Sequence, residues 1–293
     1  MIQNSYLRPR KRVLIMEKVA LKKVFPKVWD LLAIVMLFLF NYVIVQGVLL
    51  LILGLPQMPE GVDSDPELFM NYQEELAVFN AIIYPTVMLL SILIVWLYAR
   101  LRGGKRAVAI RHSIAGFNPI MILVGVLWLM SSQIILEPLT ALLPTFENPG
   151  IGRGVWAWIT AAVFAPILEE LLCRGLIFGV IRNRWGAIPA IVVSAIFFGL
   201  IHGEPSAIIV AFVAGLIFGV IYVRTSSIFS TMIIHSINNI LAFSIMCFGF
   251  EEMSWSDMVG GGVAYYALYG VAVVVFVVVT IEAGFKLLRR PKS

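Results

Sequence analysis

Eight apolar segments, each about as long as a membrane-crossing helix, follow one another along this chain. Apolar residues make up 60% of the sequence and charged residues 13%, a balance that excludes an ordinary soluble domain. Because a helix satisfies its own backbone hydrogen bonds inside lipid, the chain is expected to fold as an all-α, polytopic membrane helix bundle. The segments cover residues 31–54, 77–99, 119–137, 154–181, 187–203, 207–223, 228–248 and 263–285.

The charged stretches between these segments predict the orientation of the bundle. Basic residues precede the first segment and follow the second, fourth, sixth and eighth, whereas the other connections are acidic or neutral. Cytoplasmic loops carry an excess of Lys and Arg, so both termini are expected in the cytoplasm. The net charge of +5 therefore reports orientation and does not indicate a nucleic-acid partner. The first connection is expected to be an acidic loop with Glu60, Asp63, Asp65, Glu67, Glu74 and Glu75.

The N-terminal stretch, residues 1–30, is basic and is expected to be a cytoplasmic segment. It resembles the start of a signal peptide, but the apolar run after it is too long and lacks a clear small-residue cleavage site. We therefore expect a retained first helix. No fixed-period repeat or low-complexity linker divides the sequence after it, so residues 31–290 are expected to form a single transmembrane domain.

Ionisable side chains inside the fourth segment are its most unusual feature. Glu169, Glu170 and Arg174 lie in a stretch otherwise apolar enough to cross a membrane, where such groups cost several kcal/mol and face a protein interior or a water-filled cavity. Glu170 and Arg174 are four residues apart, so they share a helix face and can neutralise one another. Glu169 is rotated by about 100° and lacks that partner. Pro166 removes a backbone hydrogen bond, which predicts a kink or a widened turn.

Further polar residues lie in the fifth and seventh segments. The spacing places Phe198 beside His202 on one helix and His235 beside Asn239 on another. Counted from the cytoplasmic helix ends, Asn239 lies roughly 18 Å deep, His235 roughly 12 Å and His202 roughly 24 Å, against roughly 20 Å for Glu169. Since an apolar slab is about 30 Å thick, these groups are expected to meet in one buried cavity.

Such a set of side chains suits hydrolysis by water. A buried carboxylate can act as a general base, imidazole can orient water or transfer a proton, and an Asn amide can donate to an oxyanion. Glu169, His202 and His235 are also a conceivable zinc set with water as the fourth ligand. The local H-E-x-x-H motif is absent, so a zinc site rests on convergence of the three helices alone.

Three motifs in order resemble those of a known family. E-E-L-L-C-R (169–174), F-G-L-I-H (198–202) and H-S-I-N-N (235–239) are similar to the E-E-x-x-x-R, F-x-x-x-H and H-x-x-x-N motifs of the CPBP family, which groups CAAX prenyl proteases with bacteriocin-processing (Abi) enzymes. Every fixed position is filled. The resemblance covers about residues 154–245, the expected protease-like core.

The resemblance implies a glutamate-dependent intramembrane endopeptidase. Glu169 would activate water with help from His202, and His235 and Asn239 would form the oxyanion hole. Glu170 and Arg174, supported by Phe198, would position the site or engage the substrate. The family is usually labelled metalloprotease, although a direct glutamate–water mechanism is also argued for it. We expect the metal-free version, because the residues above already supply every role, with zinc as the alternative.

The expected partners are the lipid bilayer and a membrane-embedded or lipid-anchored substrate, such as a prenylated protein or a peptide. The charge pattern fits a bacterial plasma membrane or an endoplasmic reticulum, and the first is expected here. Two other functions are compatible with the sequence. A proton-coupled transporter would use the buried ionisable groups as an ion path, although they form one cluster and no inverted repeat is apparent. A catalytically idle scaffold or bacteriocin-immunity protein would keep the fold without hydrolysis.

Overall fold

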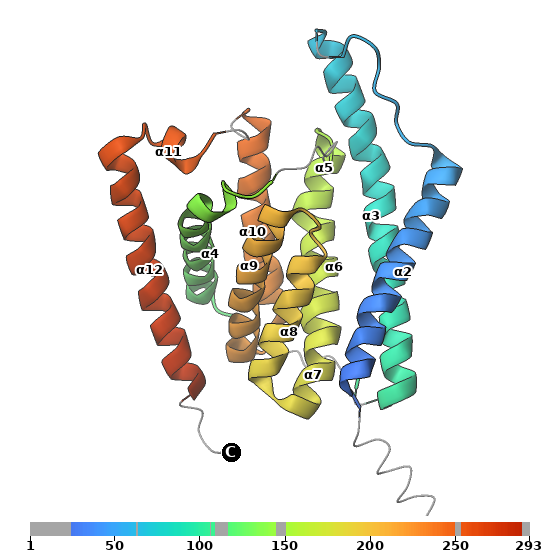
Figure 1. The fold of residues 1–293 in the computed structure, drawn as a ribbon, viewed down its shortest axis with the longest axis vertical. Helices are drawn as coiled ribbons and strands as arrows, with labels where there is room; N and C mark the ends of the chain where they lie inside the picture. Colours follow the sequence, from blue (N-terminus) through green and yellow to red (C-terminus); the bar gives the residue numbers. More distant parts are fainter. Residues whose placement is uncertain are drawn as a thin grey trace, which may run out of the picture.

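The computed structural model describes residues 25–62, 64–105, 107–108, 117–144, 151–249 and 253–288, with side chains to residue 285. Most of the basic N-terminal segment, residues 1–30, lies outside this part of the chain. All regular structure in the described residues is helical, and the long helices run side by side as a bundle (Figure 1). The expected all-α membrane bundle is confirmed. The helices are α2 (Val28–Leu53), α3 (Pro66–Gly103), α4 (Pro119–Thr140), α5 (Val155–Ile159), α6 (Ala165–Glu170), α7 (Phe178–Trp185), α8 (Ala187–Leu200), α9 (Pro205–Thr225), α10 (Ile228–Cys247), α11 (Trp255–Met258) and α12 (Gly262–Leu288).

Six of these helices are long and apolar enough to cross a membrane, so the chain is a multi-pass integral membrane protein. They are α2, α3, α4, α9, α10 and α12. The start of α2 and the end of α12 lie at the same end of the bundle (Figure 1), as an even number of crossings requires. The other two expected segments are also helical: one is the irregular run from α5 to α7, and the other is the short α-helix α8.

Helix α8 is too short to cross a bilayer without help. Its 14 residues extend about 21 Å, against a slab about 30 Å thick. The connection to α9 therefore lies partway along the bundle (Figure 1). Glu204 begins α9 by accepting a hydrogen bond from the Ala207 N–H at 2.9 Å, and its own N–H donates to the His202 carbonyl at 2.8 Å. These bonds fix the loop that carries His202.

Helix α3 begins earlier than predicted. The Asp65 carboxylate accepts hydrogen bonds from the Glu67 and Leu68 N–H groups, and Pro66 occupies the first helical position. Both are strong helix-starting signals. Glu67, Glu74 and Glu75 thus lie on the helix, and the prediction that they belong to a loop is wrong. The search for apolar segments did not include residues 66–76, because this part of the helix is polar and a helix can extend beyond the lipid.

The helical run from α5 to α7 contains two π-helical stretches, η2 (Thr160–Phe164) and η3 (Leu171–Ile177). The first directly precedes α6, where Pro166 was expected to widen the helix. Pro166 has no N–H to donate to a carbonyl one turn earlier. The Ala161 and Ala162 carbonyls instead accept hydrogen bonds from Asn239 Nδ2, at 2.9 Å, and from the Ser236 hydroxyl. The widened turn thereby fastens α10 to this run.

Polar contacts also hold α2 against α3. Asp30, buried in the first turn of α2, accepts hydrogen bonds from the Tyr98 hydroxyl at 2.7 Å and from Arg102 Nε at 3.0 Å. Farther along the two helices, Asn41 Nδ2 donates to the Ser91 hydroxyl at 2.7 Å. Buried polar groups need such partners.

Helices α8 and α9 pack closely because two glycines of α9 face α8. A Cβ built on Gly215 would lie 2.8 Å from the Ala195 Cα, and one on Gly219 would lie 3.0 Å from Ile191 Cγ2. Small residues at such crossings let helix backbones approach one another. The approach has a consequence for the site, because the Gly215 carbonyl accepts a hydrogen bond from Arg174 Nη2 at 2.9 Å.

Gly215→Ala is expected to lower the thermal stability of the purified protein, because the added methyl group meets backbone atoms that cannot move aside. Overpacking of this kind costs about 1–3 kcal/mol. Gly270→Ala is the matched control, since a Cβ at this α12 glycine meets nothing within 4 Å. Unfolding is followed by intrinsic fluorescence in detergent. Equal midpoints for both variants would contradict the packing argument.

Candidate active site

The predicted site residues come from three parts of the bundle. Glu169 and Glu170 end α6, Arg174 lies in η3, Phe198 is near the end of α8, and His202 follows α8 directly. His235 and Asn239 lie on α10. The structure brings Glu169, Glu170, Arg174, Phe198 and His235 into one cluster, with His202 and Asn239 at its edges.

Glu170 and Arg174 form a fully buried ion pair. Arg174 Nη1 donates to Glu170 Oε1 at 2.7 Å, and both side chains are 0% exposed. The guanidinium also lies over the rings of Phe198, at 4.7 Å, and Phe218, at 5.1 Å. Planar stacking and a fork of donors are properties of Arg that Lys cannot supply. The pair is a rigid support for the residues around it.

Glu169 has one oxygen bound and the other oxygen without a partner. Its Oε1 accepts a hydrogen bond of 2.5 Å from the Tyr84 hydroxyl of α3. Its Oε2 is buried and has no hydrogen-bond partner among the described residues. The whole side chain is only 9% exposed, so bulk solvent does not supply that partner. A buried carboxylate oxygen without a donor is costly unless a ligand or water satisfies it.

His235 lies between the two glutamates. Its Nε2 is 3.9 Å from Glu169 Oε2 and its Nδ1 is 3.6 Å from Glu170 Oε1, both too long for direct hydrogen bonds. Phe198 and Phe218 hold the imidazole, with ring centroids at 5.5 and 5.2 Å. The same two aromatic rings thus pack on Arg174 and on His235.

His202 is exposed and lies outside this buried cluster. Its Nδ1 is 2.8 Å from the Phe198 carbonyl oxygen, and its ring contacts the Phe198 ring at 5.0 Å. Because a carbonyl oxygen only accepts, Nδ1 carries the proton in this contact. In the neutral ring, Nε2 then keeps its lone pair for another partner. No direct contact joins His202 to Glu169 in the described part of the chain.

Asn239 belongs to a chain of amides between helices. Its Nδ2 donates to the Ala161 carbonyl, and its Oδ1 accepts from Asn238 Nδ2 at 3.3 Å. Gln133 of α4 in turn donates to Asn238 Oδ1 at 2.6 Å. An Asn amide has two N–H groups, so one can still serve a ligand.

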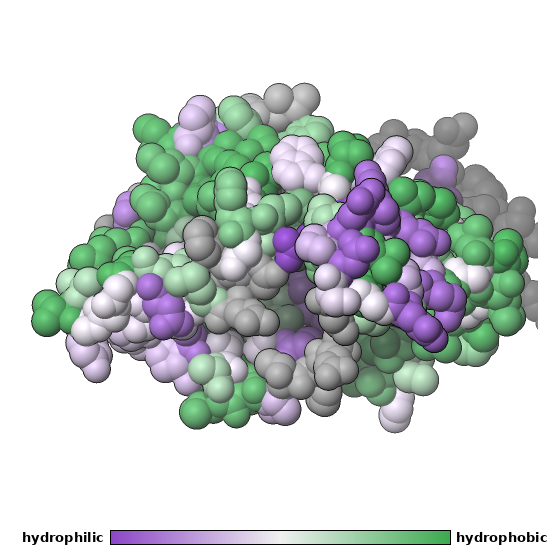
Figure 2. Space-filling view, turned by 90° about the horizontal axis from the view of Figure 1, so that it is seen from above, coloured by the Kyte–Doolittle hydropathy of each residue, from purple (hydrophilic) through white to green (hydrophobic). Residues whose placement is uncertain are grey.

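The face of the bundle opposite the end of α12 is hollowed near its centre, with hydrophilic residues visible inside the recess (Figure 2). The connection from α8 to α9 lies partway along the bundle, because α8 is short (Figure 1). His202 and the neighbouring Gly203 are exposed in that connection. An opening that reaches the middle of a membrane protein can admit water to buried polar groups.

Zinc does not fit the donors as they are arranged. Within the described ranges, no three His, Cys, Asp or Glu side chains converge closely enough to hold a metal ion. The candidate set of Glu169, His202 and His235 is not assembled in this part of the chain.

Two residues of this region were not predicted from the sequence. Tyr84 lies outside the three motifs, 85 residues before its partner Glu169, and Gln133 is 105 residues from Asn238. A signal for both existed, because hydroxyl and amide groups inside apolar segments need hydrogen-bond partners. Spacing along one helix could not identify which partner, since both contacts join different helices.

Comparison with known proteins agrees with the motifs. Residues 151–241 match a family model described as Rce1-like, type II CAAX prenyl endopeptidase Rce1-like. No curated protein and no solved structure matches the chain. The matched segment contains all three motifs, from Glu169 to Asn239. The resemblance to the CPBP family is therefore confirmed for residues 151–241, and this segment is similar to CAAX-type prenyl endopeptidases.

Proposed function

We propose that this protein hydrolyses a peptide bond of a membrane-embedded or lipid-anchored substrate with water activated by Glu169. The observation that carries the proposal is Glu169 Oε2, a buried carboxylate oxygen without a described donor, 3.9 Å from the imidazole of His235. A water molecule at this oxygen would complete its hydrogen bonding. The same water would lie in reach of the imidazole.

In the proposed reaction Glu169 removes a proton from this water as its oxygen bonds to the carbonyl carbon of the substrate. The C–N bond then breaks, and the proton passes from Glu169 to the leaving nitrogen. General bases of this kind contribute about 10²–10⁴-fold to rates. Tyr84 holds the other carboxylate oxygen, which orients Oε2 toward the water.

The remaining residues have supporting roles in this proposal. His235 and the second N–H of Asn239 would stabilise the oxyanion, a contribution of about 3–4 kcal/mol per donor in known sites. His202, exposed just after the end of α8, would assist proton transfer through Nε2. Glu170 and Arg174 would hold His235 and the helices in place. The description of the matched family supports our proposal of a lipid-anchored substrate, a prenylated one included. A bacterial plasma membrane remains our proposed location.

The test uses the purified protein and a library of membrane-tethered peptides, prenylated and unprenylated, in ¹⁸O-labelled water. Mass spectrometry identifies the new termini. We expect one ¹⁸O atom in the new carboxyl group and a rate unchanged by a strong chelator. A rate abolished by the chelator and restored by zinc would favour the metal alternative. Proton flux in liposomes without any cleavage would favour a transporter.

Tyr84→Phe is expected to lower kcat with little change in KM. A hydrogen bond to a charged group is worth about 1.5–3 kcal/mol, which corresponds to roughly a tenfold to hundredfold loss of rate. The reason is that Glu169 would keep its charge but lose the donor that orients it. The measurement is steady-state cleavage of the best peptide from the library.

Tyr98→Phe is the matched control, because Tyr98 lies on the same helix and also donates to a carboxylate, that of Asp30, away from the site. It is expected to lower thermal stability slightly and to leave kcat unchanged. Equal kcat losses in both variants would mean that Tyr84 acts only through the stability of α3.

A further inference from the structure

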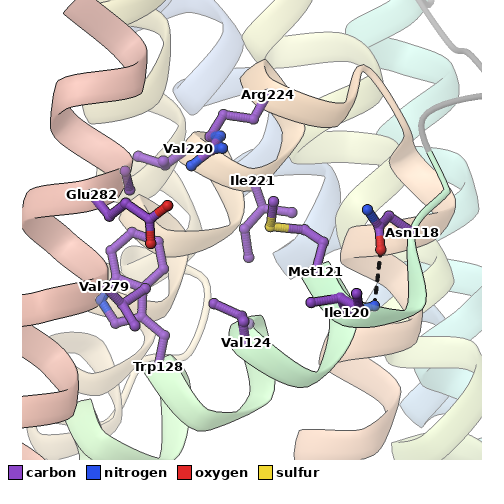
Figure 3. Close-up of a pocket in the computed structure, with 12 residues that line it drawn as sticks. Asn118, Ile120, Met121, Val124, Trp128, Val220, Ile221, Arg224, Val279 and Glu282 are labelled. Atoms are coloured by element: carbon purple, nitrogen blue, oxygen red, sulfur yellow. Dashed lines mark hydrogen bonds between the residues drawn. The ribbon is translucent and has the colours of Figure 1, made fainter.

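A cavity of about 200 Å³ lies between α4, α9 and α12 (Figure 3). Most of its wall is apolar and includes Met121, Val124 and Trp128 of α4. Two charged residues also line it: Arg224, in the last turn of α9, and Glu282 of α12. None of these residues belongs to the candidate active site.

Arg224 lines this cavity without a direct partner among the described residues. It is half-buried, and no hydrogen bond or ion pair joins it to another described residue. A guanidinium in this state retains its donor fork, which matches the geometry of a phosphate. Figure 3 shows Glu282 on the opposite helix, so the cavity presents one cation and one carboxylate.

The position of the cavity points to lipid. It lies at the end of the bundle where α3, α7 and α9 end in arginines, the level at which phospholipid headgroups meet basic residues. Next to it on α4, Ile120 is 71% and Leu123 61% exposed, which marks this side of the helix as facing the bilayer. An amphiphile at this place would have its headgroup beside Arg224 and its chains along apolar side chains.

We propose that this cavity binds a phospholipid with a phosphoethanolamine headgroup. Its phosphate would accept hydrogen bonds from Arg224, and its ammonium group would donate to Glu282, whose carboxylate has several acceptor positions. A choline headgroup has no N–H to donate, and a net anionic headgroup gains no ammonium contact with Glu282. One acyl chain of the lipid would lie along Met121, Val124 and Trp128.

The bound lipid would fasten α12 to the rest of the bundle. In the protein itself, α12 is tied to α4 by the Trp128 Nε1–H, which donates to the Thr280 hydroxyl at 3.0 Å, and by packing of Trp128 on Phe276. The lipid would add a bridge between α12 and α9. This proposal does not depend on protease activity, so the two can fail separately.

The test measures lipid binding to the purified full-length protein by native mass spectrometry, and thermal unfolding with the same lipids. The lipids are phosphatidylethanolamine, phosphatidylcholine and phosphatidylglycerol, with inorganic phosphate as the headgroup-free arm. We expect phosphatidylethanolamine to bind best and to raise the unfolding midpoint most, and phosphate alone to have no effect. Arg224→Gln should weaken binding of this lipid by about tenfold, the loss of one charge-assisted contact. Glu282→Gln should remove its advantage over phosphatidylcholine.

Lys105→Gln is the charge-matched control, because Lys105 is an exposed cation outside the cavity. It should bind phosphatidylethanolamine as the wild type does. If Arg224→Gln does not fold, Val124→Phe provides a second variant that narrows the cavity and keeps both charges. Equal binding of all three lipids by the wild type would overturn the proposal. So would unchanged phosphatidylethanolamine binding in Arg224→Gln or, where that variant does not fold, in Val124→Phe.

Discussion

Glu169→Gln is expected to reduce peptide cleavage by on the order of 10²–10⁴-fold while the protein keeps its fold. Glutamine has nearly the same shape, and its amide oxygen can still accept the hydrogen bond from the Tyr84 hydroxyl. It cannot take a proton from water. The loss should therefore appear in kcat, with the unfolding midpoint close to that of the wild type.

Glu75→Gln is the control for this substitution, since Glu75 is an exposed glutamate on α3. It should cleave at the wild-type rate in the same membrane-tethered peptides. Wild-type cleavage by Glu169→Gln would show that Glu169 is not the base. In that case Glu170 would be the remaining carboxylate of the cluster, although its Oε1 is already paired with Arg174.

The membrane segments were predictable because they depend on local composition. The segment predicted at 207–223 is the helix Pro205–Thr225, and the one predicted at 228–248 is Ile228–Cys247. Proline and capping residues outside the apolar run set the exact ends. At α3, the capping residue Asp65 and Pro66 set the start of the helix, which lies before the apolar run and could not be predicted from hydropathy.

The candidate site was predictable where one helix carries both partners. The spacing of Glu170 and Arg174 predicted a shared face, and the two residues form an ion pair. The contact between Tyr84 and Glu169 was not predictable, because it depends on how α3 packs against α6. The position of His202 was only partly predictable, since its exposure follows from the early end of α8 at Leu200. The roles of these residues in hydrolysis remain predictions.

Arg174→Met is expected to destabilise the protein by about 3–5 kcal/mol, the second large effect. The substitution leaves the Glu170 carboxylate buried at 0% exposure without its ion-pair partner, and the Gly215 carbonyl loses its donor. His235 Nδ1, at 3.6 Å, is too far to replace the guanidinium. Thermal unfolding in detergent and the yield of monodisperse protein measure the effect.

Arg102→Met is the control, because Arg102 also pairs with a buried carboxylate, that of Asp30, but its own side chain is 56% exposed. The Asp30 carboxylate keeps its hydrogen bonds from the Tyr98 hydroxyl and the Lys27 N–H, so the loss of Arg102 does not leave it without donors. This variant should unfold close to the wild type. A loss of stability as large as that of Arg174→Met would mean that the effect of Arg174→Met does not depend on the burial of the arginine.

The double variant Glu170→Gln/Arg174→Met separates the charge effect from packing. Removing both charges leaves no uncompensated buried ion, so this protein should be more stable than Arg174→Met alone. It should still cleave more slowly than the wild type, because His235 loses the carboxylate beside its Nδ1. If the double variant is no more stable than the single one, the cost of Arg174→Met arises from lost packing on Phe198 and Phe218 instead.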